Sequence, residues 1–242
     1  MTFDISRFGL AEMLRVGIDV RKQIADARSL EEAAGRVCEY LSAELAGPNG
    51  LRACALVRCY KTHAYGELEP ELQEFVKANL GGDTPRASMK CLTLMGTAGE
   101  EPEWNSRHRS KGHKAIPLPR PEIIEQAPMI AQLIREFGLD LSEVVDPGKE
   151  VVRDLMGKTY GVFHVAEARG SRFIPAQEDF VLRYGIRSVL GFGGSLTGGD
   201  LFAIILFSKV AIPESSADRF RTVALDVKSG FFKFKDDHIF AT

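Results

Sequence analysis

The clearest pattern in this chain is a pair of strands near its C-terminal end. Residues 201–208, LFAIILFS, are apolar at successive positions, so such a strand must be covered on both faces. The turn GSLTGGD before it is rich in glycine, which supplies the positive φ angles that a turn between antiparallel strands demands. We therefore predict a hairpin of residues 187–193 and 201–208 in a sheet with a layer on each face.

Three further apolar runs predict the other strands, at residues 51–60, 88–97 and 160–165. Residues 98–119, between two of these runs, are polar and irregular, and this segment is longer than most loops of a compact domain. One covering layer of the sheet is therefore expected to contain a long loop.

Helical spacing and end signals predict the helices. Leu10, Leu14, Ile18 and, less regularly, Ile24 trace one stripe within residues 4–28. Ser29 with Glu32 forms a capping box for the next helix. Prolines open further helices at residues 70, 121, 175 and 213, a helical piece is expected over 148–156, and Phe220, Val223, Val227, Phe231 and Phe234 form a stripe on the last helix.

Composition narrows the class of protein. With 242 residues, 45% of them hydrophobic, the chain has ample material for a core. A net charge of -2 gives no electrostatic reason to expect nucleic acid or an anionic membrane as partner. No apolar run reaches the roughly 18 residues of a membrane helix, and the N-terminus lacks the features of a secretory signal. Four cysteines in apolar segments, without a CxxC pair, indicate reduced, buried thiols, and we expect a cytoplasmic protein.

The order of these elements, together with the runs WNSRHRSKGHKAIPLP, MIAQLIREFGLDL and FHVAEARGSRFIPAQEDFVLRYGIRSVLGFGG, resembles the GAF-like input domain of bacterial sensor histidine kinases and related signalling proteins. The resemblance implies an α+β fold: a central antiparallel sheet of five or six strands, with the terminal helices on one face and a helical and loop excursion on the other. It divides the chain into an N-terminal helix (1–28), one GAF-like domain (29–234) and a tail (235–242).

The resemblance further implies a small-molecule sensor in signal transduction, without catalytic activity of its own. It implies a homodimer through the terminal helices and an output kinase or cyclase module, either in a longer chain or as a separate protein. In this interpretation, ligand occupancy orders the excursion and shifts the packing of the terminal helices. The ligand and any cofactor stay unidentified at this stage.

Candidate binding residues cluster in two places. The basic loop, defined here as residues 104–114 (WNSRHRSKGHK), surrounds the only tryptophan with cationic donors that suit a carboxylate or phosphate. The predicted strand at 160–165 and the segment up to residue 187 add polar and aromatic side chains, with residues 170–177 as a rim. We expect a ligand pocket on the second face, lined by Trp104, His113, Tyr160, His164, Tyr184 and Arg187, with Arg187 as the charged anchor. A solvated basic loop, a buried His164 and a surface ion pair at Arg187 are the plainer explanations.

Other chemistries find less support in the sequence. The histidine and cysteine spacings match no closed zinc site, and there is no adjacent Cys-His pair of the kind that attaches a linear tetrapyrrole. The signature of cyclic-nucleotide-binding GAF domains is also missing. Two alternatives remain: a cysteine-dependent reductase using Cys54, Cys59 and Cys91, and a dimerisation module that binds no ligand.

Overall fold

Six strands form one antiparallel sheet at the centre of the molecule. A computed structural model describes residues 2–81, 83–145, 160–234 and 239–241. The strand order is β5-β4-β3-β8-β7-β6, with β3 (Cys54–Ala64), β4 (Lys90–Gly99), β5 (Ala115–Leu118), β6 (Tyr160–Val165), β7 (Ser188–Ser195) and β8 (Leu201–Ser208). A separate parallel pair joins β1 (Phe3–Asp4) to β2 (Leu45–Ala46). The expected α+β fold with a sheet of five or six strands is confirmed.

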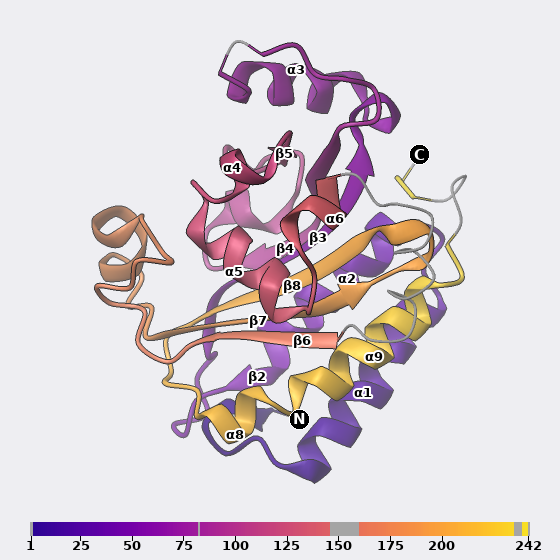
Figure 1. Ribbon diagram of the computed structural model, residues 1–242. Coiled ribbons are helices and arrows are strands. Elements are labelled where there is room, and N and C mark those ends of the chain that lie inside the picture. The colour runs from indigo at the N-terminus through magenta and orange to yellow at the C-terminus, as the bar shows by residue number, and fades with distance from the viewer. Residues whose placement is uncertain (1, 82, 146–159, 235–238, 242) are drawn as a thin grey trace.

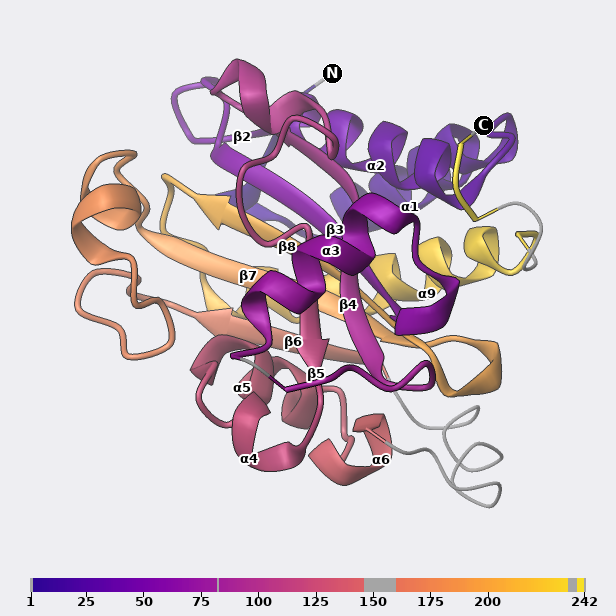
Figure 2. The same ribbon diagram turned by 90° about the horizontal axis from the view of Figure 1, so that it is seen from above.

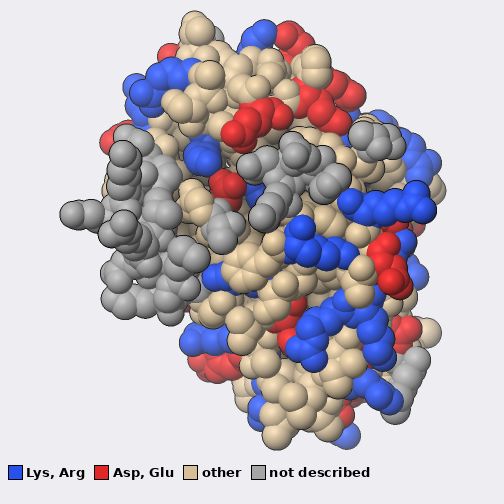
Figure 3. All heavy atoms as spheres, turned by 90° about the vertical axis from the view of Figure 1, so that its right-hand side faces the viewer, with Lys and Arg blue, Asp and Glu red and all other residues tan. Residues whose placement is uncertain are grey.

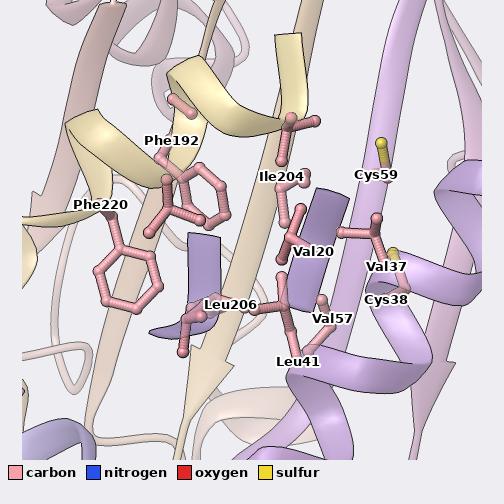
Figure 4. Packing of buried hydrophobic residues seen from close by; sticks show 14 of the residues in the cluster. Val20, Val37, Cys38, Leu41, Val57, Cys59, Phe192, Ile204, Leu206 and Phe220 are labelled. Atoms are coloured by element: carbon pink, nitrogen blue, oxygen red, sulfur yellow. The ribbon is translucent and has the colours of Figure 1, made fainter. Parts of the chain in front are cut away.

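The terminal helices cover the first face of the sheet, as predicted. This layer contains α1 (Leu10–Ala25), α2 (Leu30–Glu44), α8 (Glu214–Ala217) and α9 (Phe220–Phe231) (Figure 1). Helices α1 and α9 run side by side in the same direction, because Phe8 stacks on Phe220 near their starts and Gly230 backs onto Ile24 near their ends. Val20, Val37, Val57 and Phe192 meet in the core between these helices and the sheet (Figure 4).

The second face carries shorter elements. They are η3 (Pro102–Asn105), α4 (Pro121–Ile124), α5 (Pro128–Glu136), α6 (Leu141–Val145) and the π-helical turn η4 (Gln177–Leu182). Helices α4, α5 and α6 are seen below the sheet in Figure 2. Their apolar side chains form a second core with those of the strands. Helix α3 (Pro70–Asn79) lies beyond the ends of the strands, near β5, and short turns η1 (Ile5–Arg7), η2 (Tyr65–Glu67) and η5 (Thr197–Gly199) complete the fold (Figure 1).

Four details differ from the sequence prediction. The helix expected over 121–137 is two helices, because Pro128 cannot continue the first one and Ala127 has an extended ψ of 81°. The expected helix from Pro213 onward is likewise divided into α8 and α9. The loop expected over 98–119 contains β5, an edge strand too short to show a pattern. Of the predicted stripe on α1, Leu10, Leu14 and Ile18 face solvent, whereas Ile24 faces the core together with Met13, Val16 and Val20. The helical piece expected over 148–156 lies outside the described residues.

Surface charge and helix length add two observations. On the face shown in Figure 3, cationic and anionic side chains are interspersed. Among the described residues, every helix is either too short or too polar to cross a lipid bilayer.

The contact between α2 and β4 depends on Gly96. A Cβ atom at this position would lie 2.5 Å from the carbonyl oxygen of Ala34 and 2.6 Å from the nitrogen of Gly35. Backbone atoms cannot move aside as a flexible side chain can. Helix α2 therefore lies this close to the sheet only while residue 96 has no side chain.

We expect Gly96→Ala to lower the free energy of unfolding by about 1–3 kcal/mol, because the methyl group overpacks the contact between helix and sheet. Gly35→Ala is the matched control on the other side of the contact. Its Cβ meets no atom within 4 Å, so the substitution should stabilise the helix by about 0.5–1 kcal/mol. Urea unfolding of the two variants measures both values, and equal effects would contradict this account.

Candidate functional site

A hollow of about 490 Å³ lies along the outer edge of β5. Its walls come from Phe75 and Asn79 of α3, residues 111–113 of the basic loop, β5 itself, and side chains of α4 and α5 from Ile123 to Ile130. Figure 1 shows the elements that supply these walls, with α3 at the top and β5 and α4 below it. We call this space the edge hollow. Its lining is largely apolar, as expected for a small-molecule site.

His113 brings the basic loop into the edge hollow. Among the described non-glycine residues, His113 alone has a positive φ, 58°, which places it in the left-handed region. Such a conformation is uncommon for a residue with a side chain and persists only where the surroundings hold it. Burial, and then the positive charge of Arg58, lower the pKa of His113, so the imidazole is neutral at pH 7.

Arg58 lies directly behind this loop. Its guanidinium donates to the hydroxyl of Ser110 at 3.1 Å and to that of Tyr60 at 3.2 Å, and Nη1 is 3.5 Å from the carbonyl oxygen of Gly112. The Ser110 hydroxyl in turn donates to the same Gly112 carbonyl. The basic loop is thus held on the second face of the sheet by a buried cation.

The predicted residues Trp104 and Tyr184 lie together, but away from the edge hollow. Their ring centroids are 4.7 Å apart, and Phe180 contacts both rings. Tyr184 also donates to Glu101 at 3.0 Å. This half-buried aromatic group connects η3 to η4 and packs on the second core, so its contacts stabilise the packing of these two turns.

Tyr160 and His164 are on the opposite face of the sheet, so the structure does not bring the six expected residues together in one lining. A Cβ at Gly161 would collide with the carbonyl group of Glu136, so this position must face α5. Alternation along β6 then directs its neighbours at even positions toward the terminal helices. Tyr160 accordingly contacts Lys228 of α9, whose Nζ lies 4.8 Å from the ring centroid, and burial lowers the pKa of His164.

Arg187 lies just before β7 and is exposed. Its backbone pairs with Ala168 and Ser208, which fixes the start of the hairpin. It is not among the residues that line the edge hollow, so the structure separates the predicted anchor from the hollow.

The four cysteines are all free and buried. Cys38 and Cys59 face each other between α2 and the sheet (Figure 4), whereas Cys91 belongs to a different cluster below α3. Burial raises the pKa of Cys54 and of Cys91 to about 12 and raises those of Cys38 and Cys59 as well. Thiols held in this form are poor nucleophiles, which counts against the reductase alternative.

A network of charged and polar side chains lies near the C-terminal end of β3. Asp200 accepts from Lys61 at 2.7 Å and from Lys90 at 2.8 Å, and Thr62 donates to it at 3.1 Å. Burial opposes ionisation of Asp200, but the two lysines outweigh this effect and hold its pKa below the usual range. The network connects β3 and β4 to the start of β8. In the part of the chain that is described, we find no group of three or more potential metal ligands.

His63 lies beside this network and under the C-terminal tail. Its ring is 3% exposed, neither nitrogen has a hydrogen bond, and the ring of Phe240 covers it at 5.3 Å between centroids. Burial, and then the charge of Lys61, lower the pKa of His63 to about 3.

The sequence analysis missed Arg58. The signal was the charged residue inside the apolar run ACALVRCY, residues 53–60, since a covered strand rarely carries a cation. It also missed the edge hollow, because α3 and β5 are brought together only by the fold.

Comparisons with known proteins give the following findings. No family model matches the chain, and no curated protein matches it. Among solved structures, it is similar to a free methionine-R-sulfoxide reductase from Neisseria meningitidis in complex with its substrate, at 11% identity and a TM-score of 0.47, over 92% of this chain and 89% of that one.

Two further solved structures are similar to the chain. One is the GAF domain of a phosphoenolpyruvate-protein phosphotransferase from Coxiella burnetii, at 12% identity and a TM-score of 0.46, over 91% and 93% of the two chains. The other is the chromophore-binding domain of a bacteriophytochrome from R. palustris, at 8% identity and a TM-score of 0.46, over 97% and 64%. Likenesses at this level do not define a function. The described chain itself has the GAF-like arrangement that its sequence resembles: the expected sheet, with terminal helices on one face and the excursion on the other.

His63 should make the stability of the protein depend on pH. In the unfolded chain it takes up a proton below about pH 6.5, whereas in the folded chain its pKa of about 3 keeps it neutral. Protonation of His63 therefore does not reduce the free energy of unfolding above pH 6.5, and it reduces that free energy by about 1.4 kcal/mol for each pH unit below this value. Between pH 6.5 and 5 the wild type should lose about 2 kcal/mol more than His63→Phe. Phenylalanine keeps the ring contact with Phe240.

Urea unfolding of the two proteins at both pH values measures this difference. His113 and His164, whose pKa values are also lowered, titrate in both proteins and cancel in the comparison. Asp200 loses its charge only below the usual aspartate range. Parallel pH profiles for the two proteins would contradict the buried, neutral state of His63.

Proposed function

We propose that this chain is a small-molecule-binding sensory domain that acts as a homodimer in signal transduction, with its ligand in the edge hollow. The observation that carries the proposal is the hollow itself: about 490 Å³, largely apolar, with His113 held in a left-handed conformation in its wall. A space of this size suits a small metabolite. The pocket expected from the sequence thus moves to the edge of the second face, since the centre of that face is filled by side chains.

An exposed apolar surface supports the homodimer. Leu10, Leu14 and Ile18 of α1 are 41–58% exposed, and Leu225 of the neighbouring α9 is 45% exposed. Gly17 allows the two helices to approach closely at Asp226, which also pairs with Arg21. A contiguous apolar stripe on two parallel helices is typical of a helix–helix interface, and a second copy of the same pair would bury it.

The path from the ligand to the dimer follows the contacts described above. Strand β4 pairs with β5, which lines the edge hollow, and supports α2 at Gly96 on its other face. Helix α2 packs in turn against α1 in the first core. A ligand that binds two positions of β5 unequally would shift the equilibrium between two positions of these helices. The output kinase or cyclase, in the same chain or a separate one, would sense that change.

Filling the edge hollow should abolish binding. Ala127 lines the hollow between α4 and α5, and Ala127→Trp would occupy the space of a ligand. Native mass spectrometry of the freshly purified protein would detect a bound compound, and a thermal-shift screen of metabolites would identify others. A ligand at a hundredfold excess over its dissociation constant stabilises the wild type by about 2.7 kcal/mol, and we expect this gain to disappear in the variant.

Ala43→Trp is the matched control, because Ala43 is exposed on α2. It should keep the wild-type response. An unchanged response in Ala127→Trp would place the ligand elsewhere. A wild type that carries no compound and responds to none would favour the dimerisation module without a ligand.

A charge in the exposed stripe should separate the dimer. We expect Leu14→Glu to raise the dissociation constant by about 100-fold or more, because an unpaired carboxylate would be buried between the copies. Multi-angle light scattering during gel filtration measures the mass at several concentrations. Leu182→Glu, at an exposed leucine on η4, is the control and should stay dimeric. A monomeric wild type would contradict the homodimer.

A further inference from the structure

Arg58 is a buried cation without an anionic partner. It is 9% exposed and lies on β3 between Leu56 and Tyr60, which both belong to the second core. All of its hydrogen bonds go to neutral oxygens, and Nε has none. No carboxylate of the described residues comes within ion-pair distance of this guanidinium.

Arg107, the other buried arginine among the described residues, shows the environment of a paired guanidinium. Arg107, 7% exposed, contacts Glu31 at 2.7 Å and Glu69 at 2.9 Å, and its guanidinium lies 5.0 Å from the centre of the Phe240 ring. A buried charge without such partners is costly, and hydrogen bonds to neutral groups compensate for it only in part. The described protein groups around Arg58 therefore supply only neutral oxygens to its guanidinium.

A second unpaired polar group faces the same side. Thr97 of β4 is directly opposite Arg58 in the register, so both side chains project from the second face of the sheet. Thr97 is 5% exposed, and its hydroxyl has no hydrogen bond. A donor on Arg58 and a hydroxyl on Thr97 thus remain free within one small region.

This region adjoins the edge hollow. Gly112, whose carbonyl oxygen is 3.5 Å from Nη1 of Arg58, lines the hollow together with His113. The loop residues that contact the guanidinium, Ser110 and Gly112, therefore lie within or next to the segment 111–113 that lines the hollow. Displacing the Ser110 and Gly112 oxygens would place an anionic group on the arginine.

We propose that Arg58, assisted by Thr97, anchors the carboxylate of a small organic acid whose apolar part occupies the edge hollow. This inference rests on the proposed function and names its ligand class. A single fixed cation matches a single negative charge, and the planar guanidinium matches the two oxygens of a carboxylate. Lys111 at the rim is exposed and already paired with Glu103, and His113 is neutral, so a doubly charged phosphate would be left undercompensated.

Two acids and their uncharged counterparts test the proposal. Hexanoate and phenylacetate are titrated into the protein by calorimetry and thermal shift, next to hexanamide and phenylacetamide, with inorganic phosphate as a third arm. The proteins are wild type, Arg58→Met, Thr97→Val and, as control, Arg187→Met. Methionine fills the volume of the arginine stem without its charge. Because replacing a buried charge by an apolar side chain often leaves stability unchanged or raises it, we expect Arg58→Met to fold.

The expected result is that the wild type binds at least one acid and neither amide. Arg58→Met should weaken binding by about 10- to 100-fold, the range of a charge-assisted hydrogen bond, and Thr97→Val by less. Arg187→Met should bind like the wild type. If Arg58→Met does not fold, Arg58→Lys is the second variant. It keeps the charge but loses the planar N–H donors of the guanidinium, so it should bind the acid more weakly.

Other outcomes overturn the proposal in distinguishable ways. Equal binding of acid and amide, or full binding by Arg58→Met, would leave the hollow as a ligand site but remove Arg58 as its anchor. Loss of binding in Arg187→Met alone would assign the anchor to Arg187. A response to phosphate without a response to either acid would overturn the ligand class. If no acid binds while native mass spectrometry detects a neutral compound, the anchor fails and the proposed function stands.

Discussion

Strands β3 and β8 are buried on both faces, and the rest of the structure depends on this constraint. Nearly every residue of these two adjacent strands is inaccessible to solvent. A sheet with such a centre is stable only if two separate layers cover it. Helices α1, α2 and α9 supply the first layer in long, regular contacts, with Gly96 allowing α2 to lie directly on the sheet. The second layer is assembled from short helices and loops, which is why space remains at its edge.

The two layers have different physical characters, and this difference organises the proposed function. The first layer is continuous, and its exposed residues form an apolar stripe suited to a second copy. The second layer contains the basic loop, the edge hollow and the buried charge of Arg58. A cation inside an otherwise apolar layer lowers stability unless an anion joins it. The stability lost at such a site is the stability that a bound organic acid would restore, which links occupancy to the order of the loop.

Much of the fold could be predicted from the sequence because the signals are local. Ser29 caps α2 as expected, its side chain accepting from the Glu32 amide, and the glycine turn before β8 lies where the pattern places it. The candidate site was predicted only in part. His113 lines the hollow, and Trp104 and Tyr184 meet, but Tyr160 and His164 belong to the other face. Alternation along a strand predicts which residues share a face, but it does not predict whether that face points toward the terminal helices or toward the second layer.

By itself, the sequence determined the kinds and order of the elements, the double covering of the sheet and the buried state of its cysteines, because each depends on residues close together in the chain. Only the tertiary structure decided which stripe of α1 faces water, where the second layer leaves a hollow, and that Arg58 and Thr97 stand opposite each other without partners. These features arise from strand register and from contacts between distant segments. The close approach of Gly161 to Glu136 determines which face of the sheet each side chain of β6 points to, and no local pattern in the sequence indicates it.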